Sequence, residues 1–531
     1  MTDPDWWRGA VIYQIYPRSF QDSNGDGVGD LPGITRRLDY VASLGVDGIW
    51  LSPFFTSPMA DFGYDVADYR DVDPVFGTLS DFDALLSRAH DLGLKVIIDQ
   101  VYGHTSDQHA WFTQSRGSRD NPRADWYVWA DARADGGPPT NWPSVFGGPA
   151  WTWDARRRQY YLHNFLSAQP DLNLYNPQVQ DAILDVTRFW LERGVDGFRL
   201  DVANYYFHDD QLRDNPPSGD TDGARPYDFQ RHVYNRDRPE TLRFLERLRG
   251  VLDSRNGVMS VAEIESDDNL GRSIEYAKSP ERLHTAYNFH FLRTDDASPS
   301  RVRSGMEAWE DVGAWPSWSL SNHDIVRAAT RWSGGAPSPA RSRFLLALLL
   351  SLRGTVFLYQ GEELGLTQGV VPFEKLVDPE AIAFWPENMG RDGCRVPMPW
   401  TDADARSGFT TGDPWLPLDD DQRRLAVSVQ EGDDNSTLAF ARRFMETRAG
   451  LAAMIRGDMR FRDTAHDDVL VFERGADGET LLCAFNFGVE ASASLRLDAE
   501  VSPISEMSQG ADVSGRTLKL APNGVFIGRS T

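Results

Sequence analysis

Cysteine is almost absent from this chain of 531 residues, which contains only Cys394 and Cys483. Two cysteines that lie far apart in sequence cannot form a disulfide framework, and they lack the paired spacing of a zinc site. We therefore expect two free thiols and no cysteine-bound metal.

A long hydrophobic run is also missing. No segment approaches the ~18 consecutive apolar residues of a helix that crosses a membrane. The first residues, Met1-Thr2-Asp3-Pro4-Asp5-Trp6-Trp7-Arg8, lack the basic and apolar regions of a signal peptide. Together these absences predict a cytoplasmic protein without a membrane anchor.

Positive charge is scarce. The chain has 54 basic and 79 acidic residues, for a net charge of −25. Nucleic acids and anionic membranes bind through basic patches, so partners of both kinds are disfavoured. Aromatic residues make up 12% of the chain and include 17 tryptophans, which supply core volume and flat faces for sugar rings. The composition favours a neutral small-molecule substrate.

What is present is a series of short apolar runs, several of them continuously hydrophobic, as expected for parallel strands that are buried on both faces. Helical periodicity separates these runs, with the cap Asn176-Pro177 opening one helix and Ser80 expected to cap another. Repeated strand–helix units favour a (β/α)8 barrel over an open sheet. The eight expected strands are Val11–Tyr16, Val46–Leu51, Lys95–Val101, Gly194–Asp201, Val258–Ile264, His284–Phe289, Trp318–Ser321 and Thr355–Tyr359.

The barrel pattern is interrupted and then replaced. Residues 104–175 predict an irregular subdomain inserted after the third strand, and further insertions are expected at about 205–238 and 367–420. The barrel itself is assigned to residues 1–103 and 176–455. Near the C-terminus two mainly apolar runs, Val469–Phe472 and Thr480–Phe485, flank the turn Ala476-Asp477-Gly478, which predicts a hairpin. We assign residues 456–531 to an antiparallel β-domain, expected to be a β-sandwich.

Three acidic residues occur at the ends of expected barrel strands. Asp201 ends Gly197-Phe198-Arg199-Leu200-Asp201, Glu263 ends a second strand, and Asp324 follows a third. The carboxyl ends of barrel strands form one mouth, where the chemistry of such barrels is located. A single acid would more often be a cap or a surface charge, but three in this position predict a catalytic site.

Paired carboxylates are the machinery of glycoside hydrolysis. Arg199 beside Asp201 would keep that carboxylate ionised, which suits a nucleophile. The apolar approach to Glu263 favours a raised pKa and a role as proton donor. Asp324 would hold substrate hydroxyls as the sugar ring flattens toward the transition state.

The chain resembles glycoside hydrolase family 13, the α-amylase family, over essentially its whole length. Four family motifs appear in order: Asp99-Gln100-Val101-Tyr102-Gly103-His104, Gly197–Asp201, Glu263 and Ser321-Asn322-His323-Asp324. The resemblance implies that Asp201 is the nucleophile, Glu263 the acid/base and Asp324 the transition-state stabiliser. It implies no cofactor for catalysis. The further residues that it places around the substrate are Tyr64, Asp65, His104, Phe146, Phe165, Arg199, His323 and Arg395.

Within the family, Gln169-Pro170-Asp171-Leu172-Asn173 resembles the fifth motif of the branch of oligo-1,6-glucosidases and α-glucosidases. This implies a retaining, exo-acting α-glucosidase that acts on maltose, short malto-oligosaccharides and aryl or alkyl glucosides and can transfer glucose to acceptors. Val202, directly after the nucleophile, goes with α-1,6 linkages in that branch. Oligo-1,6-glucosidase, sucrose hydrolase and a glucosyl-isomerising relative therefore remain alternatives. A non-catalytic relative of this fold is disfavoured because all three acids are present.

The loop Asp22-Ser23-Asn24-Gly25-Asp26-Gly27-Val28-Gly29-Asp30 places oxygen-bearing side chains at alternate positions, a pattern that suits a hard cation. Gly33 stands where an EF-hand needs its bidentate glutamate, so the loop is not an EF-hand. The family resemblance implies a structural Ca²⁺ or Mg²⁺ held by Asp22, Asn24, Asp26, Asp30 and the Val28 carbonyl. A metal-free loop closed by its own turns is the alternative.

Overall fold

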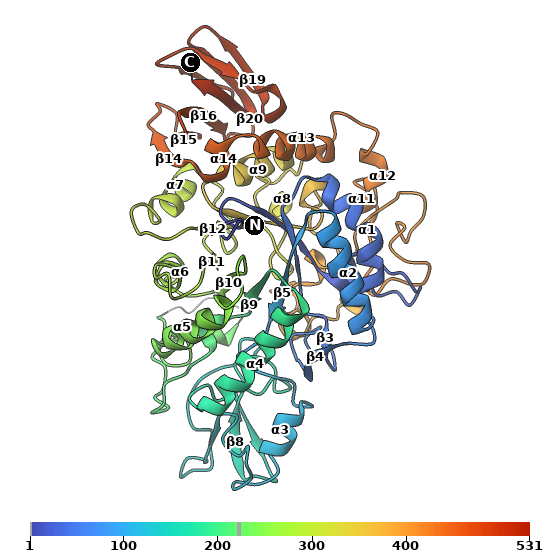
Figure 1. The fold of residues 1–531 in the computed structure, drawn as a ribbon, viewed down its shortest axis with the longest axis vertical. Helices are drawn as coiled ribbons and strands as arrows, with labels where there is room; N and C mark the ends of the chain where they lie inside the picture. The colour runs from blue at the N-terminus through green and yellow to red at the C-terminus, as the bar shows by residue number, and fades with distance from the viewer. Residues whose placement is uncertain (1–2, 220–222, 224, 531) are drawn as a thin grey trace.

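The centre of the protein is a closed barrel of eight parallel strands, seen in a computed structural model that describes residues 3–219, 223 and 225–530 (Figure 1). All eight expected strands are present, most of them shorter than predicted by one to three residues at an end. In barrel order they are β1 (Val11–Ile15), β13 (Thr355–Tyr359), β12 (Ser317–Trp318), β11 (Thr285–Asn288), β10 (Met259–Ile264), β9 (Gly197–Leu200), β5 (Lys95–Gln100) and β2 (Gly48–Leu51).

The barrel strands are buried on both faces. Alternate side chains, among them Ile12, Trp50, Ile97 and Phe357, form a cluster separate from the main core, while their neighbours along the strands pack with the surrounding helices. This explains the continuously hydrophobic strand sequences. The long helices are α1 (Leu31–Ser43), α2 (Leu79–Asp91), α4 (Pro177–Arg193), α5 (Glu240–Leu252), α6 (Asn269–Ala277), α7 (Pro299–Glu307), α9 (Pro339–Ser351) and α13 (Thr437–Ala449).

The first insertion, after β5, is more ordered than the sequence predicts. It contains α3 (Ala110–Ser115) and a three-stranded antiparallel sheet of β6 (Trp129–Ala130), β8 (Gln159–Leu162) and β7 (Trp151–Asp154). In Figure 1 it extends from the barrel at the end opposite the C-terminal domain. Nearby, β3 (Phe55–Thr56) pairs with β4 (Asp68–Val72).

The other two insertions consist mainly of loops and short helical turns. Residues 205–238 contain the turn Pro226–Phe229, and this insertion includes positions outside the described residues. Residues 367–420 contain the turns Phe373–Lys375 and Asp392–Cys394 and the short helix α10 (Pro379–Phe384). Four more short helices complete the barrel region: α8 (Ala328–Arg331), α11 (Asp420–Arg423), α12 (Val427–Gln430) and α14 (Ala452–Arg456).

The C-terminal domain is antiparallel, as expected, and hydrogen bonds link its seven strands into one sheet. The long strand β20 makes this link, because it pairs with β16 and β18 along one half and with β17 and β19 along the other; the stacking of a β-sandwich stays a prediction. The predicted hairpin is confirmed: Asp477 and Gly478, both with positive φ, join β15 to β16. The strands are β14 (Asp458–Arg462), β15 (Val469–Ala476), β16 (Glu479–Asn486), β17 (Ala493–Arg496), β18 (Val501–Pro503), β19 (Gln509–Ser514) and β20 (Thr517–Ser530).

Both cysteines are free and buried, as expected. Among the described residues, no helix has the length and apolar character needed to cross a membrane.

Candidate active site

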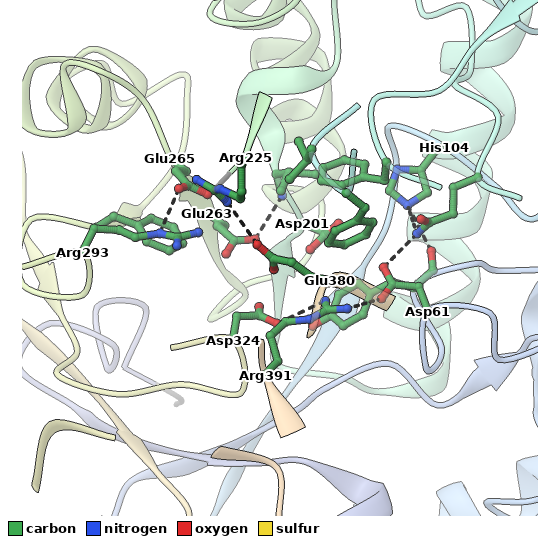
Figure 2. Close-up of a pocket in the computed structure, with 17 residues that line it drawn as sticks. Asp61, His104, Asp201, Arg225, Glu263, Glu265, Arg293, Asp324, Glu380 and Arg391 are labelled. Atoms are coloured by element: carbon green, nitrogen blue, oxygen red, sulfur yellow. Dashed lines mark hydrogen bonds and ion pairs between the residues drawn. The ribbon is translucent and has the colours of Figure 1, made fainter. Parts of the chain in front are cut away.

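The three acids predicted to be catalytic line one pocket at the carboxyl ends of the barrel strands. Asp201 directly follows β9, Glu263 lies within the end of β10, and Asp324 lies in the loop after β12. The pocket has a volume of about 630 Å³. Figure 2 shows Asp201 and Glu263 near its middle, with His104 and Asp61 on one side and Arg293 and Glu265 on the other. The barrel topology therefore brings together residues that are 123 positions apart (201 to 324).

One guanidinium contacts two of these acids. Arg199, which is fully buried, donates from Nη1 to Asp201 Oδ1 at 2.6 Å and to Asp99 Oδ1 at 2.7 Å, and from Nη2 to Glu263. Its guanidinium also lies over the Trp50 ring at 5.1 Å. Three carboxylates thus share one permanent positive charge in a region from which water is largely excluded.

Burial raises the pKa of all three carboxyl groups, and Arg199 opposes that effect. The resulting pKa is about 6 for Asp99, about 7 for Asp201 and about 8 for Glu263. Since a single cation cannot compensate three negative charges, the group favours keeping a proton, and Glu263, which has the highest pKa, holds it most strongly. The order of pKa values fits an ionised Asp201 beside a protonated Glu263.

Asp324 has the opposite electrostatic environment. Burial alone would raise its pKa, but positive charge at His323, Arg395 and Arg391 outweighs burial and lowers that pKa below its usual range. Burial also lowers the pKa of His323 to about 3, so we attribute the effect to the two arginines. Arg395 donates to Asp324 Oδ1 at 2.6 Å, and Arg391 lies 3.6 Å from the same oxygen. Asp324 is therefore a firmly ionised carboxylate.

The predicted aromatic and histidine residues surround one end of the pocket. The Tyr64 ring stacks on His323 with centroids 5.4 Å apart, and its hydroxyl lies 2.5 Å from His323 Nε2. His104 lies 3.1 Å from the Tyr64 carbonyl oxygen, and burial lowers its pKa to about 4. Phe165 contacts both His104 and Phe146, at centroid distances of 5.3 and 5.8 Å. Tyr64, His104, Phe146 and Phe165 all line the pocket.

Asp65 does not line the pocket, contrary to the sequence prediction. Its carboxylate is fully buried and accepts hydrogen bonds from Ser57 Oγ and from the backbone N–H groups of Ala60 and Asp61, at 2.8 to 3.0 Å. Asp61 occupies the pocket wall instead and contacts Arg391 at 2.8 Å. The two carboxylates stand four positions apart in one turn, and nothing in the sequence alone tells which of them turns inward.

Arg395, the arginine predicted to bind substrate, does not line the pocket either. Arg395 is fully buried behind the wall, where it donates to the His323 carbonyl oxygen at 2.7 Å and to Asp324. Arg391 lines the pocket and lies 4.9 Å from the Phe146 ring centroid. Arg199 and His323 also lie behind the lining residues and act on the pocket through the carboxylates that they contact.

Val202 lines the pocket in a strained backbone conformation, with φ 34° and ψ 49°. A β-branched residue rarely adopts this left-handed region, and such conformations cost roughly 1–3 kcal/mol. Its backbone N–H points at Glu263 Oε2 over 3.3 Å. The turn after the nucleophile therefore helps to position the acid/base carboxyl group.

Four charged residues that the sequence did not single out form the other end of the pocket. Arg293 pairs with Glu265 at 2.9 Å, and Arg225 pairs with Glu380 at 3.3 Å. Arg225 comes from the 205–238 insertion and Glu380 from the 367–420 insertion, so the two insertions meet at the pocket, as Figure 2 shows. Gln169, Val145 and Phe289 complete the lining. Only Gln169 had a motif that could have identified it.

Two further histidines, His163 and His208, lie outside the pocket. His163 is hydrogen-bonded to Thr152 and to the Phe165 carbonyl oxygen, at 2.9 Å each. His208 packs between Trp142 and Tyr175. Neither belongs to the pocket lining.

The predicted cation loop is closed by hydrogen bonds. Asp22 Oδ1 accepts from the backbone of Asn24 and Gly25, and its Oδ2 accepts from Gly27 N–H and Thr410 Oγ1, all at 2.5 to 2.9 Å. Asp30 accepts from Ser23. Within residues 3–219, 223 and 225–530, no three His, Cys, Asp or Glu side chains are grouped as metal ligands. Asp22 and Asp30 thus already accept hydrogen bonds within the loop and from Thr410, and the bound cation stays a prediction.

Known proteins resemble this chain over nearly its whole length. The family described as "Alpha amylase, catalytic domain" matches residues 14–457. The chain is 50% identical to a "Probable alpha-glucosidase" of Rhizobium meliloti (strain 1021), covering 99% of this chain and 97% of that protein. It is 36% identical to an "Oligo-1,6-glucosidase" of Heyndrickxia coagulans, covering 91% and 92%. The solved structure of an "alpha-glucosyl transfer enzyme, XgtA" matches with a TM-score of 0.95, 54% identity and 99% of each chain.

Proposed function

The chain belongs to the alpha-amylase family of glycoside hydrolases, and we propose that it is a retaining, exo-acting α-glucosidase that can also transfer glucose. It removes α-glucose from the non-reducing ends of short α-glucosides such as maltose. The observation that supports this proposal best is the sharing of Arg199 by Asp201 and Glu263. Two carboxylates on one guanidinium are close neighbours, as in retaining enzymes, whose carboxyl groups are about 5–5.5 Å apart.

In the first step, Glu263 donates its proton to the glycosidic oxygen while Asp201 attacks the anomeric carbon of glucose. The bond to the aglycone breaks, and a covalent glucosyl–Asp201 ester forms. Asp324, kept ionised by Arg391 and Arg395, accepts hydrogen bonds from sugar hydroxyls as positive charge develops in the ring.

In the second step, the deprotonated Glu263 takes a proton from the incoming hydroxyl, whose oxygen attacks the anomeric carbon and releases Asp201. Water as the attacking group gives free glucose, and a sugar or alcohol hydroxyl gives a new α-glucoside. The similarity to XgtA, an "alpha-glucosyl transfer enzyme", supports the second outcome.

The closed end of the pocket supports exo action. Asp61, Arg391 and the Phe146 ring contact one another in the wall near His104, and the proposal places the non-reducing end of the substrate against this wall. The relatives named as α-glucosidases and oligo-1,6-glucosidases, together with Val202, keep α-1,6-linked substrates as the second candidate.

The proposal is tested by activity on maltose, isomaltose, sucrose and an aryl α-glucoside, with Asp201→Asn as the key variant. We expect Asp201→Asn to lose about 10⁴-fold or more of kcat because no covalent ester can form. The exposed Asp91→Asn, at the end of α2 and outside the pocket, serves as the matched control and should behave like the wild type. NMR of the first product should show α-glucose; initial β-glucose, or full activity in Asp201→Asn, would refute the mechanism.

A further inference from the structure

A second hollow lies on the outer surface, between the first insertion and helix α4. It has a volume of about 810 Å³ and shares no lining residue with the catalytic pocket. Strand β4, the start of α3 and helix α4 form its sides; in Figure 1, α3 and α4 lie near one another below the barrel. None of the catalytic steps above uses it. We call it the α3–α4 groove.

The floor of the α3–α4 groove is aromatic. The Trp111 ring lies 4.5 Å from His109 and 5.1 Å from Trp126, measured between centroids, and 6.0 Å from Tyr69. His109, Trp126 and Tyr69 are buried, whereas Trp111 is only half-buried. The floor therefore exposes part of one indole that is held in place by three fixed rings.

The floor also carries ring N–H groups without partners. His109 Nδ1 accepts the Trp111 backbone N–H at 3.0 Å, and burial lowers the His109 pKa to about 4, so its single ring proton is on Nε2. Trp126 is only 8% exposed, and its Nε1 has no hydrogen-bond partner in the part of the chain described here. The Trp126 N–H therefore has a hydrogen bond left to make at the floor of the groove.

The rim of the groove carries both signs of charge. Asp68 and Arg70 of β4 are exposed, and Arg70 makes no ion pair with any described residue. Arg123 lies 4.5 Å from the Trp126 ring centroid on one side, and Asp185 of α4 stands on another. Two carboxylates and two guanidiniums balance, so the groove does not select an anion or a cation.

We propose that the α3–α4 groove is a second carbohydrate-binding site, which binds a short neutral α-glucan with one glucose ring against Trp111. An aromatic face matches the apolar face of a pyranose ring. Neighbouring carboxylate, guanidinium and ring N–H groups match hydroxyls, which both donate and accept hydrogen bonds. The choice of an α-glucan rests on the proposed function; the binding of a neutral sugar rests on the groove alone.

The test is calorimetric titration of maltotriose into the protein with its catalytic pocket saturated by the iminosugar 1-deoxynojirimycin, which also stops hydrolysis. We expect binding at one site per chain. Trp111→Ala should abolish it, and Arg70→Ala, a change at an exposed side chain that does not endanger folding, should weaken it about tenfold by removing a charged hydrogen bond. The matched control Trp153→Ala removes an indole that is 45% exposed on β7 and should bind like the wild type.

Turnover of an aryl α-glucoside should be unchanged in Trp111→Ala and Arg70→Ala, because neither residue lies in the catalytic pocket. No maltotriose binding to the saturated wild type, or equal binding in both groove variants and the wild type, would overturn the second site. Failure of the proposed function shows separately, as absence of turnover on the substrate panel without inhibitor.

Discussion

At the scale of single residues, the protonation of the three carboxyl groups around Arg199 determines the pH range in which the site is active. Activity needs Asp201 ionised and Glu263 protonated, and their pKa values are about 7 and about 8. We therefore expect kcat/KM for an aryl α-glucoside to rise with pH through about 7 and to fall through about 8, because it reports the free enzyme.

This pH profile has a direct control. Glu263→Gln cannot lose a proton, so with a leaving group that needs no protonation the falling limb should disappear while the rising limb remains. A wild-type optimum below pH 5, with both limbs shifted to acid, would contradict the assignment of a raised pKa to each carboxyl group.

The neighbours Asp61 and Asp65 should separate binding from stability. Asp61 contacts Arg391 in the pocket wall, whereas Asp65 is enclosed by its own turn. We expect Asp61→Asn to lower kcat/KM roughly 10- to 100-fold with little change in melting temperature, through loss of charged hydrogen bonds. Asp65→Asn should mainly lower the melting temperature. The reverse pattern would restore the sequence-based choice of Asp65.

The sequence was sufficient to place the residues that stand at strand ends, and insufficient to place those carried by loops. Asp201 and Glu263 lie at strand ends, so the barrel topology alone brings them together. Asp61 and Arg391 depend on which way a loop turns, which is decided by contacts between distant segments. Their neighbours Asp65 and Arg395 have the same residue types, so composition could not separate them.

At the scale of elements, the sequence predicts the start of a helix where the capping side chain and the backbone N–H group that it bonds are close in sequence. Asn176 caps α4, and Pro177 takes its first position, as predicted. Helix α2 begins earlier than expected, since Thr78 and Asp81 form a reciprocal capping box and Ser80 lies inside the helix. Thr78 and Ser80 can both cap a helix. Only Thr78 forms the capping box with Asp81, which satisfies two backbone N–H groups, so the helix begins directly after Thr78.

Arg225 and Glu380 join the two insertions at the pocket. A substitution of Arg225 therefore tests whether the insertions take part in substrate binding. Arg225 lines the pocket away from His104 and Asp61, where the proposed function puts the second sugar of a disaccharide. We expect Arg225→Met to lower kcat/KM for maltose about tenfold, through loss of a charged hydrogen bond, and to change the aryl glucoside much less. Arg231→Met, in the same insertion but exposed and outside the pocket, is the control. Equal losses on both substrates would point to a general loosening of the loops.

At the scale of the whole molecule, the barrel and its antiparallel C-terminal domain followed from periodicity, but the way in which the C-terminal strands are linked did not. Strand patterns predict alternation of buried and exposed faces, and β15 and β16 show it by sending alternate side chains to two different clusters. The pairing of one long strand, β20, with four others is a tertiary feature. It links the strands into one sheet and has no local sequence signal.

The proposed structural cation is also tested on the whole molecule. If Ca²⁺ or Mg²⁺ binds the Asp22–Asp30 loop, removing it with a chelator should lower the melting temperature by a few degrees, since a ligand at 100 times its Kd adds about 2.7 kcal/mol. Asp26→Asn should reduce the effect. An unchanged melting temperature with no metal detected would mean that the hydrogen bonds of Asp22 and Asp30 close the loop by themselves.

Arg391 joins parts of the chain that are remote in sequence, because it contacts Asp61, Asp324 and Asp378 at 2.8, 3.6 and 2.7 Å. The closed end of the pocket therefore exists only after the last insertion has docked on a finished barrel. During refolding, helical circular dichroism should return before catalytic turnover does. Recovery of catalytic turnover therefore reports the last step of folding, the docking of this insertion.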